Sequence, residues 1–199
     1  MVSGWPVHAC REIDQREKRE NLRHFLIDTD TASDDALALV MALNDPGVTV
    51  GAVTIVAGNV PLDQAVQNAL YVVDLCGKNV PVYAGRPKPL LRELVTAQST
   101  HGQDGMGNIG LSLSGREPVA GSAMEAMTVA VDRFETDLTL VTLGPLTNVA
   151  IALLADPSIA SRIGECVVMG GIGLGHGNVV PAAEYNIWVD PDAAQIVFD

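Results

Sequence analysis

The chain has 199 residues, with 12 Lys and Arg against 24 Asp and Glu, which gives a formal net charge of -12. Proteins that follow nucleic-acid phosphates need clustered cations, so this balance argues against a nucleic-acid partner. With 48% hydrophobic residues the chain is too apolar for disorder, and its length favours one folded core.

No hydrophobic run approaches the ~20 residues of a membrane span, and the N-terminus lacks the charged-then-apolar pattern of a signal peptide. The three cysteines, Cys10, Cys76 and Cys166, are widely spaced, which favours reduced thiols over a disulfide framework. These features predict a cytoplasmic protein that does not engage a membrane.

Residues 1–22 are rich in charge and show no strand-like alternation, so we expect an appended arm or short helix before one domain over residues 23–199. From His24 on, short apolar runs alternate with longer segments of helical period. The expected strands are 24–28, 48–56, 80–84, 138–143 and 165–169. The expected helices are about 34–44, 62–76, 122–134 and 146–154, with another from near Pro191.

This alternation predicts an α/β fold with a mostly parallel open sheet and helices on both faces. Ligand sites in such sheets lie at the carboxyl ends of the strands, where loops lead into helices. Four expected strands end in unusual loop residues, at 28–35, 57–59, 143–145 and 169–171. Residues 86–121 show weak periodicity and many Gly and Ser, so we expect an excursion or lid there.

Four aspartates, Asp28, Asp30, Asp34 and Asp35, follow the first expected strand. They repel one another unless a positive charge lies among them. Since residues 24–77 contain no Lys or Arg, that charge comes from a distant segment or from a bound hard cation such as Ca²⁺ or Mg²⁺. The structural alternative is that the aspartates cap a turn and open a helix.

A second polar cluster, Asn178, Glu184 and Asn186, follows the last expected strand. Two amides and a carboxylate suit several hydroxyl groups of a sugar, although the segment alone is equally compatible with a surface turn. Residues 105–110 match G-x-G-x-x-G, but no strand precedes them, so their context excludes a dinucleotide site. His101 has no evident partner and is interpreted as solvated or packed.

In combination, these motifs resemble the inosine–uridine-preferring nucleoside hydrolases, from about Phe25 to the end of the chain. The shared residues are Asp28-Thr-Asp30-x-x-x-Asp34-Asp35-Ala, Ala57-Gly58-Asn59, His101-Gly-x-Asp-Gly, Gly144-Pro-Leu-Thr-Asn148, Val168-Met-Gly-Gly, Gly177-Asn178 and Ala183-Glu184-Tyr-Asn186 with Asp190-Pro. The family's usual Pro-Gly after the second aspartate is Thr31-Ala32 here, with the carboxylate spacing intact. The resemblance implies a nucleoside hydrolase-like α/β fold with a Rossmann-like core.

The resemblance also implies Ca²⁺-dependent hydrolysis of the N-glycosidic bond of a ribonucleoside to ribose and free base, by a homo-oligomer. Asp30 is expected to ligate calcium and to act as general base toward a calcium-bound water. Asp35 and the backbone carbonyl of Leu143 are expected to be further calcium ligands. The expected substrate-binding residues are Asp34, Asn59, Met169, Asn178, Glu184 and Asn186. A carboxylate-rich pocket suits the positive charge of an oxocarbenium-like transition state.

Family members typically continue beyond the point where this chain stops, with a further aspartate ligand and a residue beside the leaving base. We therefore expect an α/β domain that lacks the family's C-terminal part, binds calcium weakly and turns over poorly. Base preference is not assigned. Two alternatives are a catalytically inactive nucleoside- or ribose-binding remnant and a haloacid dehalogenase-type Mg²⁺ phosphohydrolase with Asp28 as nucleophile. The shortage of phosphate-binding cations counts against the second.

Overall fold

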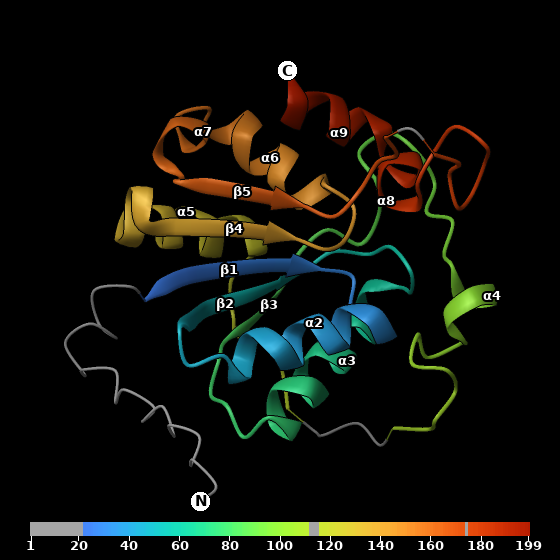
Figure 1. Cartoon of the computed structure of the whole chain (residues 1–199), viewed down its shortest axis with the longest axis horizontal. Coiled ribbons are helices and arrows are strands. Elements are labelled where there is room, and N and C mark those ends of the chain that lie inside the picture. The colour runs from blue at the N-terminus through green and yellow to red at the C-terminus, as the bar shows by residue number, and fades with distance from the viewer. Residues whose placement is uncertain (1–21, 112–115, 174) are drawn as a thin grey trace, which may run out of the picture.

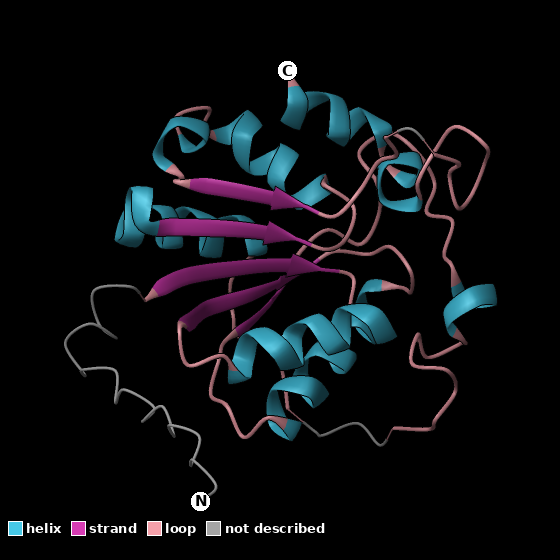
Figure 2. Ribbon diagram, viewed as in Figure 1, coloured by secondary structure: helices cyan, strands magenta, loops and turns pink. Residues whose placement is uncertain are grey.

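The structure, a computed structural model, describes residues 22–111, 116–173 and 175–199. Its centre is a five-stranded sheet in the order β3-β2-β1-β4-β5. The strands are β1 (Arg23–Thr29), β2 (Val48–Ile55), β3 (Val82–Ala84), β4 (Leu138–Thr142) and β5 (Glu165–Val168). All four pairings are parallel, so the arrowheads in Figure 2 point the same way.

Helices cover both faces of this sheet (Figure 1). The longer ones are α2 (Ser33–Asn44), α3 (Leu62–Leu75), α5 (Ala123–Phe134), α6 (Thr147–Ala155) and α9 (Pro191–Phe198). The shorter ones are α4 (Gln98–His101), α7 (Ile159–Arg162) and α8 (Tyr185–Val189), with a 3-10 turn at Glu135–Asp137. The predicted fold class is therefore confirmed, including the helix near Pro191. The short helices α4, α7 and α8 were not expected, because four or five residues carry no helical period.

Two apolar layers hold the helices to the sheet, because neighbouring residues of a strand point to opposite faces. Ile27 of β1 packs with α2 and α3 on one face, in a cluster that includes Leu39 and Val73. Leu26, the residue before it, packs with α5 and α6 on the other face, in a cluster that includes Met127. Buried on both faces, β1 is the middle of the sheet.

Side-chain caps fix where two of the helices begin. At α5, the Ser122 hydroxyl accepts a hydrogen bond from the Glu125 N–H at 3.2 Å, and a Glu125 carboxylate oxygen accepts one from the Ser122 N–H at 2.7 Å. At α9, Asp190 accepts a hydrogen bond from the Ala193 N–H at 3.1 Å, directly before Pro191 at the first helical position. Asp190 is fully buried and also accepts a 2.6 Å hydrogen bond from the Thr147 hydroxyl, which ties α9 to α6.

The carboxyl ends of three strands meet at the side chain of Asn148, which is fully buried in α6. Its Nδ2 donates to Asp28 Oδ1 of β1 at 2.8 Å and to the Ile55 carbonyl of β2 at 3.1 Å. Its Oδ1 accepts from the Arg86 N–H, just beyond β3, at 2.9 Å. This amide therefore sets how the loops after these strands lie relative to one another.

The predicted boundaries of the strands and longer helices hold within two residues. The largest difference is at β3, which begins at Val82 and not at residue 80. Residues 86–121 are irregular apart from α4 in the part that is described. The expected arm over residues 1–22 lies, except for Leu22, outside the described residues. Among the described residues, Cys76 and Cys166 are free, and none of the helices has the length and apolar character to cross a membrane.

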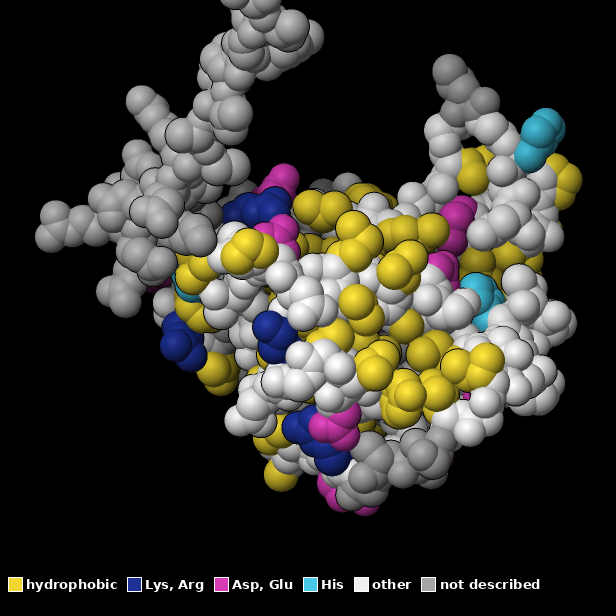
Figure 3. Space-filling model, turned by 60° about the horizontal axis from the view of Figure 1, so that its bottom comes forward, with side chains coloured by type: hydrophobic (Ala, Val, Ile, Leu, Met, Phe, Trp, Pro, Cys, Tyr) yellow, Lys and Arg dark blue, Asp and Glu magenta, His cyan; other side chains and the backbone are white. Residues whose placement is uncertain are grey.

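The face that α2 and α3 cover exposes many hydrophobic side chains and few Lys or Arg (Figure 3). Leu37 and Met41 of α2 are both more than 60% exposed. A mostly apolar groove of about 650 Å³ runs beside α2, with Phe25, Ile27 and Met41 among its lining residues. The polar residues singled out in the sequence lie elsewhere, around a smaller cavity.

We expect Asn148→Ala to lower the free energy of unfolding by about 3 kcal/mol, because it leaves the buried Asp28 carboxylate and two backbone groups without this partner. Urea unfolding followed by circular dichroism measures the change. The matched control is Asn44→Ala, which removes an exposed amide that bonds the Val40 carbonyl within α2 and is expected to cost under about 1 kcal/mol. Equal losses for the two variants would contradict the importance of the Asn148 contacts.

Candidate active site

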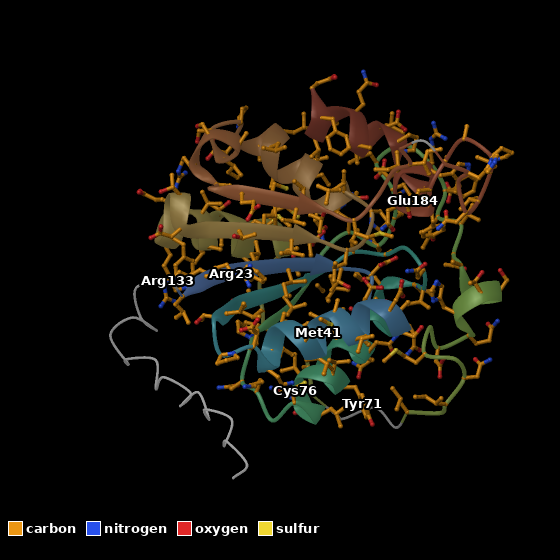
Figure 4. All side chains as sticks on the ribbon, in the orientation of Figure 1. Arg23, Met41, Tyr71, Cys76, Arg133 and Glu184 are labelled. Carbon is orange, nitrogen blue, oxygen red and sulfur yellow. The ribbon has the colours of Figure 1, made fainter. Side chains whose placement is uncertain are left out.

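The candidate site lies beyond the carboxyl ends of β1 and β4, where the strand order changes direction. Figure 4 shows Glu184 at this end of the sheet, with Arg23 and Arg133 at the opposite end. A cavity of about 140 Å³ opens here between the ends of the strands, α2, α4 and α8. Its lining residues are Asp34, Asp35, Asn59, Ala97, Thr100, His101, Leu143, Met169, Asn178, Val179, Glu184, Tyr185 and Asn186.

Asp30 lies under this cavity and is fully buried. Its Oδ2 accepts a hydrogen bond from the Asn59 N–H at 2.5 Å, whereas its buried Oδ1 has no hydrogen-bond partner in the structure. Gly58 and Gly144 press against it: a Cβ on Gly58 would lie 2.1 Å from Oδ2, and one on Gly144 would lie 3.0 Å from Oδ1. The Asn59 N–H and the two glycines therefore fix the position of this carboxylate, and Oδ1 is left as an acceptor without a hydrogen-bond partner.

Asp35, at the start of α2, is 6% exposed. Its Oδ1 accepts from the Thr29 hydroxyl at 2.9 Å and its Oδ2 from the Ala32 N–H at 3.0 Å. Asp34 is exposed instead, with Oδ1 3.8 Å from Nδ1 of His101. The loop between the aspartates is tight enough to give Thr31 a φ of +26°, which is rare for a β-branched residue.

Burial is the main cause of raised carboxyl pKa values in this loop. It raises the pKa of Asp28 to about 7, against hydrogen bonds from Asn148 and Thr54 that lower it. Burial and then the charge of Asp35 raise the pKa of Asp30. Burial and the charge of Asp34 raise the pKa of Asp35. Ionising these carboxyls is therefore costly until a cation is nearby.

The chemistry of these donors fits a hard cation. Carboxylate and carbonyl oxygens are the ligands that Ca²⁺ prefers, and Asp30 Oδ1 is a buried oxygen without a partner. In the arrangement seen, however, no three His, Cys, Asp or Glu side chains of the described residues converge as a metal-binding group. Any ion here therefore needs ligands of other kinds as well, such as backbone carbonyls or water.

The second polar cluster, expected in a loop after the last strand, surrounds the start of α8, a helix that the sequence did not predict. Glu184 caps the helix: Oε1 accepts from the Asn186 N–H at 2.9 Å, and Oε2 accepts from the Gly171 N–H at 3.1 Å. Asn178 Oδ1 accepts from the Tyr185 N–H at 2.8 Å. These bonds aim the side chains at the cavity but use part of their hydrogen-bonding capacity.

Asn186 contacts the loops that follow β4 and β5. Its Nδ2 donates to the Leu143 carbonyl at 2.8 Å and to the Met169 carbonyl at 3.2 Å. The Leu143 carbonyl, predicted as a metal ligand, is thus beside the cavity and accepts a hydrogen bond from Asn186. Met169 is 46% exposed at the cavity wall. All the predicted site residues line this cavity except Asp30, which lies beneath it. Their roles stay predictions.

Three features of the site were not predicted from the sequence. His101 lies in the cavity wall near Asp34, a contact that only the folding of residues 86–111 creates. Tyr185 also lines the cavity and donates from its hydroxyl to the Val95 carbonyl at 2.8 Å; burial raises its pKa. The buried Asn148 was noted only as part of a motif, and its contacts to three strand ends have no sequence signal.

The chain is thus an α/β protein with an open parallel sheet and carboxylates at its switch point, the place where such proteins generally bind small ligands. Comparison with known proteins narrows this class. The family model described as inosine-uridine preferring nucleoside hydrolase matches residues 25–199. The chain is 39% identical over 176 residues to the pyrimidine-specific ribonucleoside hydrolase RihB of Escherichia coli strain K12, covering 88% of this chain and 56% of that protein.

Solved structures agree. A plant nucleoside hydrolase, PpNRh1, is 41% identical with a TM-score of 0.85, covering 88% of this chain and 56% of that one. A purine-preferring ribonucleoside hydrolase from Gardnerella vaginalis is 37% identical with the same TM-score, covering 88% and 57%. The chain therefore belongs to the inosine–uridine preferring nucleoside hydrolase family, and it spans about half the length of the curated relatives it matches.

The raised pKa of Asp28 predicts how stability depends on pH without metal. Between its unfolded value of 3.8 and its folded value of about 7, the folded chain keeps a proton that the unfolded chain has released. The free energy of unfolding therefore falls as pH rises through this window, by at most about 4 kcal/mol from this group. Asp28→Asn keeps an acceptor for Asn148 and Thr54 and cannot ionise.

Urea unfolding from pH 4 to pH 8 in EDTA measures this effect. We expect the loss of stability between these pH values to be smaller in Asp28→Asn than in the unmodified chain. Asp63→Asn, at an exposed position in the first turn of α3, is the control and should leave the pH dependence unchanged. A pH dependence in Asp28→Asn equal to that of the unmodified chain would contradict the assigned shift.

Proposed function

We propose that the protein hydrolyses the N-glycosidic bond of ribonucleosides, releasing ribose and a free base. The observation that carries this proposal is the buried Asp30, with one oxygen unpartnered, directly beneath a cavity lined by amide and carboxylate side chains. Membership of a nucleoside hydrolase family supports it. The relatives' names include pyrimidine-specific and purine-preferring enzymes, so the proposal assigns no base.

The ribose would be held by the predicted side chains around the cavity. Asn59, Asn178 and Asn186 offer amide donors and acceptors to sugar hydroxyls, and the Glu184 carboxylate offers several acceptor lone pairs. The backbone bonds to Glu184 and Asn178 support this role, because they fix both side chains before a ligand arrives. Asp34 would accept from a further hydroxyl, and Met169 would pack against the sugar.

Asp30, Asp35 and the Leu143 carbonyl would hold a calcium ion. When bound, calcium lowers the pKa of water and orients it. The Leu143 carbonyl oxygen accepts one hydrogen bond, from Asn186 Nδ2, and its second lone pair would be available to the ion. Asp30 would act as the base toward this water, and the hydrogen bond from the Asn59 N–H to Oδ2 leaves Oδ1 without a partner.

Negative charge around the cavity favours the reaction itself. The ribose ring gains positive charge as the bond to the base breaks, and Asp34 and Glu184 line the space that it would occupy. Glu184 is buried, so little water screens its charge, whereas Asp34 is exposed and contributes less. Among the residues that line the cavity there is no Lys or Arg to oppose it.

The phosphohydrolase alternative has lost its support. It requires Asp28 to attack a phosphoryl group, but Asp28 is fully buried and does not line the cavity. Its Oδ1 accepts hydrogen bonds from Thr54 and Asn148, and its Oδ2, although without a partner, is buried as well. Binding of a ribonucleoside or ribose without turnover is the remaining alternative outcome. A homo-oligomer and a cytoplasmic location stay predictions from the sequence.

Release of reducing sugar from inosine and uridine tests the proposed reaction. With calcium present we expect turnover by the purified chain above the uncatalysed rate, and a loss of at least about a hundredfold in Asp30→Asn, because a general base contributes on this scale. Asp63→Asn serves as the control and should retain full activity. Calorimetry with inosine separates the outcomes: binding without sugar release would support the non-catalytic alternative, and the absence of both would contradict the proposal.

Calcium binding has its own test in thermal unfolding. Because Asp30 and Asp35 have raised pKa values, protons compete with the cation, so calcium should raise Tm more at pH 8 than at pH 5. A concentration of 100 times Kd adds about 2.7 kcal/mol of stability. Asp35→Asn should abolish the shift and Asp63→Asn should keep it. A shift that is equal at both pH values, or that survives Asp35→Asn, would contradict this site.

A further inference from the structure

Asn68 in α3 does not line the cavity, yet it bonds to two segments that form its walls. The residue is 2% exposed. Its Nδ2 donates to the Thr31 carbonyl at 2.9 Å and to the Asp104 carbonyl at 2.8 Å. Its Oδ1 accepts from Gln64 Nε2 at 2.9 Å. Both amide protons and the amide oxygen are therefore used, which fixes the orientation of the side chain.

On one side, Asn68 holds the loop between the proposed metal ligands. The Thr31 N–H donates to the Thr29 hydroxyl at 3.0 Å, and that hydroxyl donates to Asp35 at 2.9 Å. The positive φ of Thr31 makes the loop strained for a β-branched residue. Such a conformation persists when its surroundings hold it, and Asn68 supplies a donor to the carbonyl of this same residue.

On the other side, Asn68 holds the segment that carries His101. Asp104 Oδ1 accepts from the N–H groups of Met106 and Asn108, both at 2.8 Å, and the Gly107 N–H donates to the His101 carbonyl at 2.8 Å. These hydrogen bonds join residues 101–108 into one unit.

Gly105 lets this unit approach α3. Its φ is +73°, and a Cβ on it would lie 2.8 Å from a methyl carbon of Val60 and 3.3 Å from Nδ2 of Asn68. A side chain at this position would push the unit away from α3 and lengthen the bond between Asn68 and the Asp104 carbonyl.

We propose that Asn68 is a positioning residue for the proposed reaction. One amide sets the separation between the carboxylate loop, with Asp30 and Asp35, and the segment that brings His101 to Asp34. The inference rests on the proposed function, because the carboxylates matter as ligands only there. The positioning itself is a property of the folded chain, and it can be measured with no ligand present.

Asn68→Asp keeps the shape of the side chain and puts an oxygen where two carbonyl oxygens require donors. Asn68→Ala removes the bonds without this repulsion and serves if the first variant does not fold. The control is Val72→Ala, one turn along α3, which shortens a buried apolar side chain that takes no part in these hydrogen bonds. It destabilises the same helix by loss of packing.

Hydrogen exchange followed by mass spectrometry is the first measurement. In the Asn68 variants we expect exchange to increase by at least about tenfold in peptides covering both 27–36 and 97–108, with β4 unchanged. Val72→Ala should increase exchange within α3 and leave both segments as in the unmodified chain. Unchanged exchange in the two segments, or the same pattern in the Asn68 and Val72 variants, would overturn the proposal.

Calcium titration by calorimetry is the second measurement. Loss of a supporting residue typically weakens a metal site by about 10–100-fold, so Asn68→Asp should raise the calcium Kd within this range while Val72→Ala leaves it within about twofold. An unchanged Kd in Asn68→Asp would overturn the positioning role. Absence of calcium binding by the unmodified chain would count against the proposed metal site, and the exchange data alone would then decide whether Asn68 positions the two segments.

Discussion

The structure depends on one buried contact, between the Asp28 carboxylate and the Asn148 amide. A carboxyl group in the middle of a sheet is expensive to bury, and partners that stay in place reduce this cost. Asn148 also contacts the last carbonyl of β2 and a backbone N–H just beyond β3, so the same amide aligns the ends of three strands. The loop with Asp30 and the loop with Asn59 begin at these aligned ends. The position of the strand ends therefore determines the shape of the cavity.

The sequence predicted the fold because its periodicity is regular from β1 to α6, and it predicted the site because parallel strands bring their carboxyl ends to one edge. Asp35, Asn59, Glu184 and Asn186 were placed together on this principle, and they line one cavity. The resemblance to a family contributed the chemical roles. Without it, the four aspartates together favoured a hard cation over a helix start but did not distinguish Ca²⁺ from Mg²⁺.

Other features of the site had no sequence signal, because they come from contacts between distant segments. His101 lacked a visible partner since Asp34 is 67 positions away along the chain and only residues 86–111 bring them together. The bonds of Asn68 join α3 to two irregular loops, and an asparagine in a helix has no distinguishing pattern. Nor could the sequence show that Asn186 already bonds the Leu143 carbonyl.

Gly58 and Gly144 constrain how this site can change during evolution. Both lie against Asp30, and the space for even one more carbon is missing. A mutation to alanine at either position would displace the carboxylate while most of the sheet and its two apolar layers stayed intact. Because an alanine codon differs from a glycine codon by one nucleotide, a single change at either position could end the proposed chemistry while the fold survives.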